Sequence, residues 1–116
     1  MLEALTQANE LWLREHPNAP GIYHAGIRYQ PEPPGREDWD AFPQILKQGW
    51  GDCEDLVGAR CAELRVRGRV RAYPDFVWRT ITHRDGRKQD VYHILVRYPD
   101  GRFEDPSRIL GMGSIR

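Results

Sequence analysis

Three residues have the types and the order along the chain that nucleophilic catalysis needs: Cys53, His93 and Asp105. A cysteine thiolate attacks a carbonyl carbon, and a nearby histidine takes the thiol proton. A carboxylate bonded to one imidazole nitrogen fixes the tautomer and leaves the other nitrogen as a base. The chemistry that these residues predict is acyl transfer through a thioester, provided that the surrounding elements bring the side chains together.

Cys53 is expected at the start of a helix over residues 52–67. Asp52 is a suitable N-cap for this helix, and Asp55 resembles the second half of a capping box. The N–H groups of the first helical turn favour a thiolate, whereas the charges of Glu54 and Asp55 oppose it. Helical spacing places Cys53 on the apolar side of the helix, so we expect its sulfur to point between the helix and the sheet.

His93 is the histidine expected in the middle of a strand, over residues 90–98. The following residues 98–102 fit a three-residue hairpin loop. This loop pairs Leu95 with Asp105, which places Asp105 on the same face as His93 and diagonally across from it, at about 7–8 Å between Cβ atoms. A two-residue loop would turn Asp105 to the other face of the sheet.

Each of these residues also has a structural interpretation. Cys53 fits a small packed side chain, His93 a half-buried ring bound to any acceptor, and Asp105 a cap for the turn that follows it. Cys61, in the middle of the same helix, is expected only to pack. Together, Cys53, His93 and Asp105 fit the pattern of nucleophile, base and orienting group.

Helices come first along the sequence. Apolar residues at helical spacing predict a helix over residues 1–15, ended by Pro17. Residues 20–36 are rich in proline and aromatic side chains, which favours an ordered, extended loop rather than a flexible linker. A short second helix is predicted after this loop, capped by Asp38 or Asp40.

Strands follow in the second half of the chain. They are predicted over residues 70–81, 90–98 and 102–105, with turns at Asp85-Gly86 and Asp100-Gly101. Helices followed by an antiparallel meander predict one α+β domain over residues 1–116, with the helix that begins near Cys53 packed on a small antiparallel sheet.

The charge balance argues against polyanionic partners. Lys+Arg and Asp+Glu each total 17, so the formal net charge is +0 and no general field attracts nucleic acid or an anionic membrane. The arginine-rich stretch 65–71 is expected to be a solvated helix end. No secretion signal begins the sequence, and no apolar run is long enough to span a bilayer. A cytoplasmic protein with reduced thiols is therefore expected.

The expected partner is a peptide or protein amide substrate, and no cofactor is expected. Cys53 and Cys61 would lie roughly 12 Å apart along one helix, which is too far for a disulfide. A zinc site built from cysteine, histidine and aspartate is an alternative use of the same residue types. Structural zinc, however, usually takes paired cysteines at short spacing, and this sequence has none.

Three segments resemble the transglutaminase-like superfamily of cysteine enzymes. They are residues 49–56 (GWGDCEDL), 91–96 (VYHILV) and 101–107 (GRFEDPS). The resemblance implies a papain-like triad in the order Cys53, His93, Asp105. The stretch 35–39 (GREDW) is similar to compact proteins encoded by bacteria and their phages. The chain departs from the family in lacking a large N-terminal region and in having two acids after the cysteine.

The resemblance implies a cysteine protease or amide hydrolase. The alternatives are a protein-glutamine acyltransferase with the same triad and a non-catalytic binding or virion-assembly protein that keeps the fold. An oxyanion needs hydrogen-bond donors, and the backbone N–H of Cys53 is the first candidate. The candidate second donors, or groove residues, are Trp50, Gln44 and Gln48. Specificity would come from the loop 20–36 and the groove beside Trp50.

Overall fold

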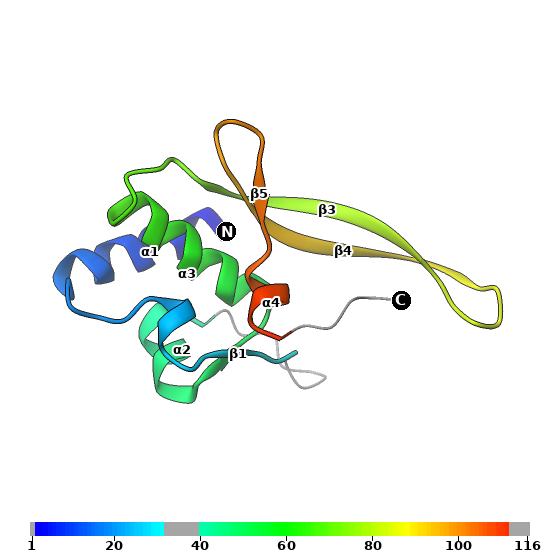
Figure 1. Cartoon of the computed structure of the whole chain (residues 1–116), viewed down its shortest axis with the longest axis horizontal. Coiled ribbons are helices and arrows are strands. Elements are labelled where there is room, and N and C mark those ends of the chain that lie inside the picture. Colours follow the sequence, from blue (N-terminus) through cyan, green and yellow to red (C-terminus); the bar gives the residue numbers. More distant parts are fainter. Residues whose placement is uncertain (1, 32–39, 112–116) are drawn as a thin grey trace.

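The structure is a computed structural model that describes residues 2–31 and 40–111. The described chain is α+β, as the sequence predicts. Figure 1 shows its elements, which are in chain order α1 (Leu2–Glu15), the 3-10 helix η1 (Ile22–His24), β1 (Arg28–Tyr29), α2 (Phe42–Gln48), β2 (Trp50–Gly51), α3 (Cys53–Val66), β3 (Tyr73–Thr82), β4 (Lys88–Arg97), β5 (Phe103–Glu104) and α4 (Pro106–Ile109).

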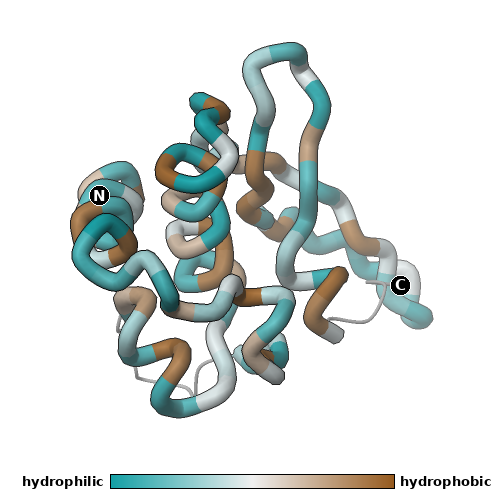
Figure 2. Tube along the Cα trace, turned by 60° about the vertical axis from the view of Figure 1, so that its left-hand side comes forward, coloured by the Kyte–Doolittle hydropathy of each residue, from teal (hydrophilic) through white to brown (hydrophobic). Residues whose placement is uncertain are grey.

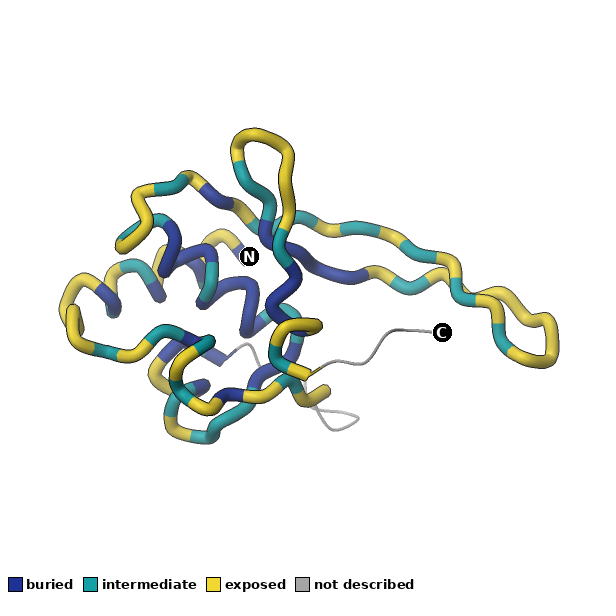
Figure 3. Tube along the Cα trace, in the orientation of Figure 1, coloured by how far each residue is buried: buried dark blue, intermediate teal, exposed yellow. Residues whose placement is uncertain are grey.

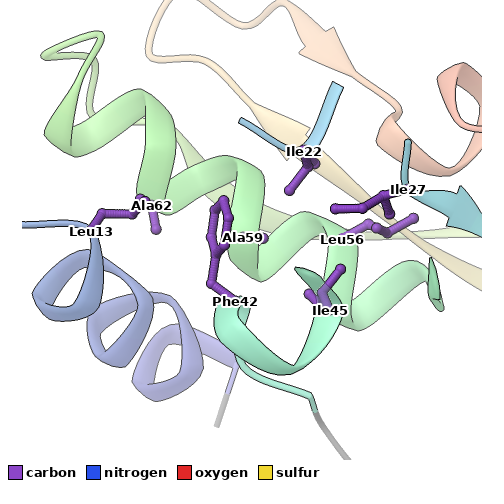
Figure 4. Close-up of a cluster of buried hydrophobic side chains, with 8 residues drawn as sticks. All are labelled: Leu13, Ile22, Ile27, Phe42, Ile45, Leu56, Ala59 and Ala62. Carbon is purple, nitrogen blue, oxygen red and sulfur yellow. The ribbon is translucent and has the colours of Figure 1, made fainter. Parts of the chain in front are cut away.

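Helix α3 lies at the centre of the molecule, with α1 on one side and the strands on the other (Figures 1 and 2). One hydrophobic cluster joins α3 to the N-terminal elements (Figure 4). Its buried members are Leu13, Ile22, Ile27, Phe42, Ile45, Leu56, Ala59 and Ala62. A second cluster joins α3 to the sheet, with buried members Leu2, Val57, Cys61, Leu64, Ala72, Ile94 and Val96. Cys61 is therefore a packing residue, as predicted.

The start of α3 is fixed by the capping box that the sequence predicts. Oδ1 of Asp52 accepts the N–H of Asp55 (3.0 Å), and Oδ2 of Asp55 accepts the N–H of Asp52 (3.2 Å). Gly51 permits the close approach before this turn, because a Cβ at that position would lie 3.1 Å from Cδ2 of Leu56. The position of Cys53 on the first turn of α3 is thus set by its immediate neighbours.

Helix α2 is capped by a residue from another helix. Its N-cap is Ala41, which has no capping side chain, and Oδ1 of Asn9 in α1 accepts the N–H of Phe42 (2.8 Å). The prediction that Asp40 caps this helix is wrong: the N–H of Asp40 donates instead to Oδ1 of Asp55 (2.7 Å). The other predicted cap, Asp38, lies outside the described residues.

The turn between β4 and β5 has the predicted three-residue loop. The N–H of Tyr98 donates to the carbonyl of Arg102 (2.8 Å), and Gly101 has a φ of 93°. Val96 consequently lies opposite Glu104, which is the register that the sequence predicts. Strand β5 is shorter than predicted, because Asp105 leaves the sheet to cap α4.

The strand boundaries differ modestly from those predicted. Strand β3 begins at Tyr73 rather than at residue 70, and β4 begins at Lys88 rather than at residue 90. Strands β3 and β4 pair antiparallel without interruption along their whole length. The glycines of the two predicted turns, Gly86 and Gly101, both have positive φ angles.

The sequence did not predict the short parallel pair of β1 and β2. Arg28 lies opposite Trp50, and Tyr29 lies opposite Gly51. The backbone of residues 28–30 therefore runs beside the segment that leads into Cys53. This pairing places Tyr29 next to the candidate nucleophile, although the two are far apart in the sequence.

The β3–β4 hairpin projects beyond the helices and accounts for much of the longest dimension of 50 Å. Figure 3 shows that its outer half is mostly exposed, whereas the inner half of β4 is buried. Within residues 2–31 and 40–111, no helix has both the length and the apolar character needed to cross a membrane.

Candidate active site

His93 and Asp105 form a buried pair, with exposed fractions of 4% and 8%. Nε2 of His93 lies 3.0 Å from each carboxylate oxygen of Asp105. An ionised carboxylate only accepts hydrogen bonds, so Nε2 carries the proton and Nδ1 is the nitrogen left as a base. Asp105 also accepts the N–H of Arg108 (3.3 Å) as the N-cap of α4. The predicted pair is present, and the structural role as a cap is present with it.

His93 stabilises the ionised form of Asp105. Burial alone would raise the pKa of Asp105, but the hydrogen bond and charge of His93 outweigh it, and the pKa lies below its ordinary value. Asp105 is therefore ionised near neutral pH. Within the described part of the chain, no hydrogen bond occupies Nδ1 of His93.

Cys53 is half-buried at the first position of α3. The pKa of its thiol is raised to about 12, mainly by burial and then by the charges of Glu54 and Asp52. These charges outweigh the helix N–H groups, which lower the pKa. The N–H groups at the helix start favour a thiolate and the charge of Glu54 opposes it, both as expected, but burial outweighs the N–H groups. Desolvation is the largest cause, and the sequence gives no measure of it.

The structure does not join Cys53 to the other two residues by a hydrogen bond, as far as the described residues go. Ile94 and Val96 of β4 pack in the same cluster as α3, and Cys53 packs against this cluster. Because side chains alternate along a strand, His93 lies on the opposite face of β4. The expectation that the sulfur side of α3 meets His93 directly across the sheet is thus not met, and a Cys53–His93 contact has to form around the strand edge.

Strand β5 is too short to block such a contact. It ends at Glu104, opposite Val96, so at the level of His93 the neighbouring chain has already left the sheet. Asp105 and α4 lie on this side, and α4 packs along α3. A common site for the three predicted residues would therefore lie between the start of α3 and this edge of β4.

Tyr29 is a site residue that the sequence did not identify. Burial raises the pKa of its hydroxyl, and the negative groups of Cys53 and Asp105 are among those that raise it further. Tyr29 therefore lies within electrostatic range of both residues. Its position depends on the pairing with Gly51, and no local pattern in the loop 20–36 predicts that pairing.

The glutamines predicted as oxyanion donors have other partners. Nε2 of Gln48 donates to Oδ2 of Asp40 (3.0 Å) and to the carbonyl of Trp50 (2.7 Å), which uses both of its N–H groups. Gln44 lies on the exposed side of α2, where its Nε2 donates to Oε1 of Gln48 (3.2 Å). Both N–H groups of Gln48 are thus used within the protein, and Gln44 donates to its carbonyl oxygen, so a role of either residue at the site stays a prediction. Trp50 is half-buried in β2, opposite Arg28.

Two buried carboxyl groups lie directly beside the nucleophile. Burial, followed by the neighbouring charge of Asp55, raises the pKa of Asp52 to about 7. Burial likewise raises the pKa of Asp55 to about 6, although it accepts the N–H groups of Asp40 and Asp52. The start of α3 therefore gains negative charge as the pH rises through the neutral range.

A polar network holds β5 against α3 behind the site. Glu104 accepts hydrogen bonds from Nε of Arg60 (2.7 Å), from the hydroxyl of Tyr98 (2.7 Å) and from the hydroxyl of Tyr23. Arg60 also bonds to Glu63 (3.3 Å) and lies over the ring of Tyr23, 4.8 Å from its centroid. This network fixes the strand from which Asp105 follows.

An aromatic surface begins next to the site. Phe76, Trp78 and Tyr92 line a hollow of about 330 Å³ on the face of the sheet that carries α3. The hydroxyl of Tyr92 donates to Oε1 of Glu54 (3.0 Å), the residue after Cys53. The hollow therefore opens beside the start of α3.

The described residues contain no group of three or more His, Cys, Asp and Glu side chains arranged to hold a metal ion. Comparisons of the chain with protein-family models, with curated proteins and with solved structures find no significant match. The arrangement of the residues themselves therefore carries the functional argument.

Proposed function

We propose that the chain is a thiol-dependent acyl-transfer enzyme, specifically a cysteine protease or amide hydrolase with a transglutaminase-like, papain-like core. Cys53 is the nucleophile, His93 the base and Asp105 the residue that orients His93. The observation that carries the proposal is the buried His93–Asp105 pair, with Nε2 held 3.0 Å from both oxygens and Nδ1 left as a base. Asp105 leads directly into α4, which packs against the helix that Cys53 begins.

In the proposed reaction, Nδ1 of His93 takes the thiol proton as the sulfur of Cys53 attacks the carbonyl carbon of a peptide or protein amide. The C–N bond breaks, His93 returns the proton to the departing amine, and a thioester remains. Water then attacks the thioester, again with His93 as base, and releases a carboxylic acid and the thiol.

The raised pKa of Cys53 determines the step at which its thiol proton passes to His93. Burial keeps the thiol protonated at neutral pH, so the base acts during the attack and not on a preformed thiolate. The two side chains must first come within hydrogen-bond distance. Catalytic hydrogen bonds are often long without substrate and tighten in the bound complex.

Tyr29 takes the place of Gln48 as the candidate second oxyanion donor. A phenol close to Cys53 can donate to the oxygen that becomes negative when the sulfur attacks, together with the backbone N–H of Cys53. Burial and nearby negative charge raise the pKa of Tyr29, so the hydroxyl keeps its proton for this purpose. Tyr29→Phe should lower kcat/KM by roughly 10- to 1,000-fold without unfolding the protein.

The test is the rate at which iodoacetamide alkylates Cys53 in the full chain near neutral pH, followed by mass spectrometry. If Cys53 reaches His93 in the free protein, the ring takes the thiol proton as the sulfur attacks iodoacetamide. Cys53 should then react faster than glutathione, and His93→Ala should remove the excess. Cys61, which is fully buried, serves as an internal reference. Capture of an acyl group by an added amine would identify the acyltransferase alternative, because hydrolysis and amine transfer divide only at the thioester.

A second candidate function is a non-catalytic binding or virion-assembly protein that keeps the fold. The raised pKa of Cys53 and the position of His93 on the opposite face of β4 favour it. Under this alternative, Cys53 reacts no faster than glutathione and His93→Ala leaves its rate unchanged. The alkylation experiment therefore separates the two proposals.

A further inference from the structure

Strand β3 forms one edge of the three-stranded sheet, and in the described part of the chain no strand pairs with its outer side. Residues of an antiparallel pair alternate between hydrogen-bonded and non-hydrogen-bonded positions. In the register of this hairpin, the N–H of His83 donates to the carbonyl of Arg87 (2.8 Å). Odd-numbered residues of β3 therefore bond to β4, and the N–H and C=O groups of Phe76 and Trp78 point outward.

The hydrogen bonds on the other side of β4 agree with this assignment. The N–H of Tyr98 donates to Arg102, so even-numbered residues of β4 bond to β5 and odd-numbered ones to β3. The outward groups of β3 thus belong to its even-numbered residues. Pro74 is one of them and has no N–H to offer, which restricts any pairing at this edge to the residues that follow it.

Arg79 is the charged residue in the rest of the edge, residues 76–82, which otherwise has few of the features that keep sheet edges apart. Proteins protect such edges with lysine, proline or a β-bulge. Residues 76–82 contain neither lysine nor proline, and their register with β4 is continuous. Phe76 and Trp78 are 53% and 72% exposed. A long, regular edge with exposed aromatic side chains is a surface on which another strand can pair.

The sequence of β3 is complementary to itself about Val77. When a second β3 runs antiparallel with Val77 opposite Val77, Phe76 lies opposite Trp78. These are the residues whose backbone groups point outward, so they form the hydrogen-bonded pairs. The same alignment places Asp75 opposite Arg79 at non-hydrogen-bonded positions, where opposite side chains come closer. Placing Trp78 opposite itself instead would lose both charge pairs.

We propose that the chain forms a symmetric dimer in which two β3 strands pair antiparallel about Val77 and join the two sheets into one. The two-fold axis repeats each contact, so the aromatic pair and the charge pair each occur twice. Oδ2 of Asp75 accepts Nε of Arg97 in its own chain (3.0 Å), which leaves Oδ1 for Arg79 of the second copy. The inference uses no residue of the candidate active site and does not depend on the proposed function.

Analytical ultracentrifugation of the full chain over a range of concentrations tests the association. The expected result is a reversible species of twice the 13.5 kDa chain mass. Arg79→Asp places two carboxylates opposite each other and should weaken the dimer by about tenfold. Combining it with Asp75→Arg reverses both charges and should restore the association. Arg84→Asp, in the exposed hairpin turn, makes the same charge change outside the pairing and should leave it unaltered.

Oxidative cross-linking tests the register. Cα atoms of a non-hydrogen-bonded pair lie about 4.5 Å apart, within the range of a disulfide. Val77→Cys should therefore give a disulfide-linked dimer, in the presence and absence of Cys53→Ser, whereas Ile81→Cys should not. Circular dichroism checks that each variant is folded. A wild-type chain that stays monomeric overturns the proposal, as does a dimer that neither cross-links through Val77→Cys nor responds to Arg79→Asp.

Discussion

Asp105 accepts Nε2 of His93 with both carboxylate oxygens, and with the same side chain it caps helix α4. One residue therefore joins the strand that carries the candidate base to the helix that packs along α3. The cap fixes where the carboxylate lies, and the carboxylate fixes the tautomer of His93. The charge and the cap can be removed separately, because asparagine at position 105 keeps the cap but not the charge.

Asp105→Asn should therefore leave the fold intact and lower reactivity. Asparagine still caps α4, but it no longer stabilises the protonated ring, and in a Ser-His-Asp triad the same change costs about 10⁴ in kcat. We expect the alkylation rate of Cys53 near neutral pH to fall toward that of His93→Ala. Asp100→Asn, in the exposed turn where Asp100 accepts the N–H of Arg102, is the matched control. Equal rates for both variants would count against an orienting role for Asp105.

Arg60→Met should destabilise the protein by about 3 kcal/mol, because it leaves Glu104 and Glu63 buried without their cationic partner. Urea unfolding followed by circular dichroism measures the change. Arg87→Met removes an exposed ion pair with Asp85 and should cost less than about 0.5 kcal/mol. If the two variants lose the same stability, the network around Glu104 does not hold β5 in place.

Features set by neighbouring residues could be predicted from the sequence. The capping box of Asp52 and Asp55 lies within one helical turn, and the loop after Tyr98 fixes the β4–β5 register through Gly101. That register by itself predicts Asp105 beside His93. Local chemistry thus predicted the start of α3 and two of the three candidate catalytic residues in contact.

Features that depend on contacts between distant segments could not be predicted. Asn9 caps α2 from another helix, and Tyr29 reaches the candidate site through its pairing with Gly51. The protonation state of Cys53 could not be predicted for a related reason. Burial by the whole fold raises the pKa of the thiol more than the N–H groups in the first turn of α3 lower it. A helix start identifies where a thiol lies but not how far it is removed from water.

Glu54→Gln should lower the pH at which Cys53 becomes reactive. Burial is the largest cause of the raised pKa of Cys53, and the charge of Glu54 is the next. Glutamine keeps an oxygen that accepts the hydroxyl of Tyr92, so the local contact survives. The measurement is the pH dependence of alkylation, whose midpoint should move down. Glu15→Gln, at the exposed end of α1, provides a charge-matched control whose midpoint should equal that of the wild type.

Asp52→Asn should change how stability depends on pH. The pKa of Asp52 rises from 3.8 to about 7 on folding, mainly through burial. The folded state therefore binds this proton more tightly than the unfolded state, so the wild type loses stability as the pH rises from about 4 to about 7. Asparagine removes the titration and keeps an oxygen for the N–H of Asp55. We expect the free energy of unfolding of the variant to exceed that of the wild type by roughly 1–3 kcal/mol at pH 8, and this advantage to disappear near pH 4. Asp85→Asn, in the exposed β3–β4 turn, is the control and should show no such trend. If the stability of Asp52→Asn instead parallels that of the wild type at every pH, Asp52 is ionised in the folded protein at little cost in free energy.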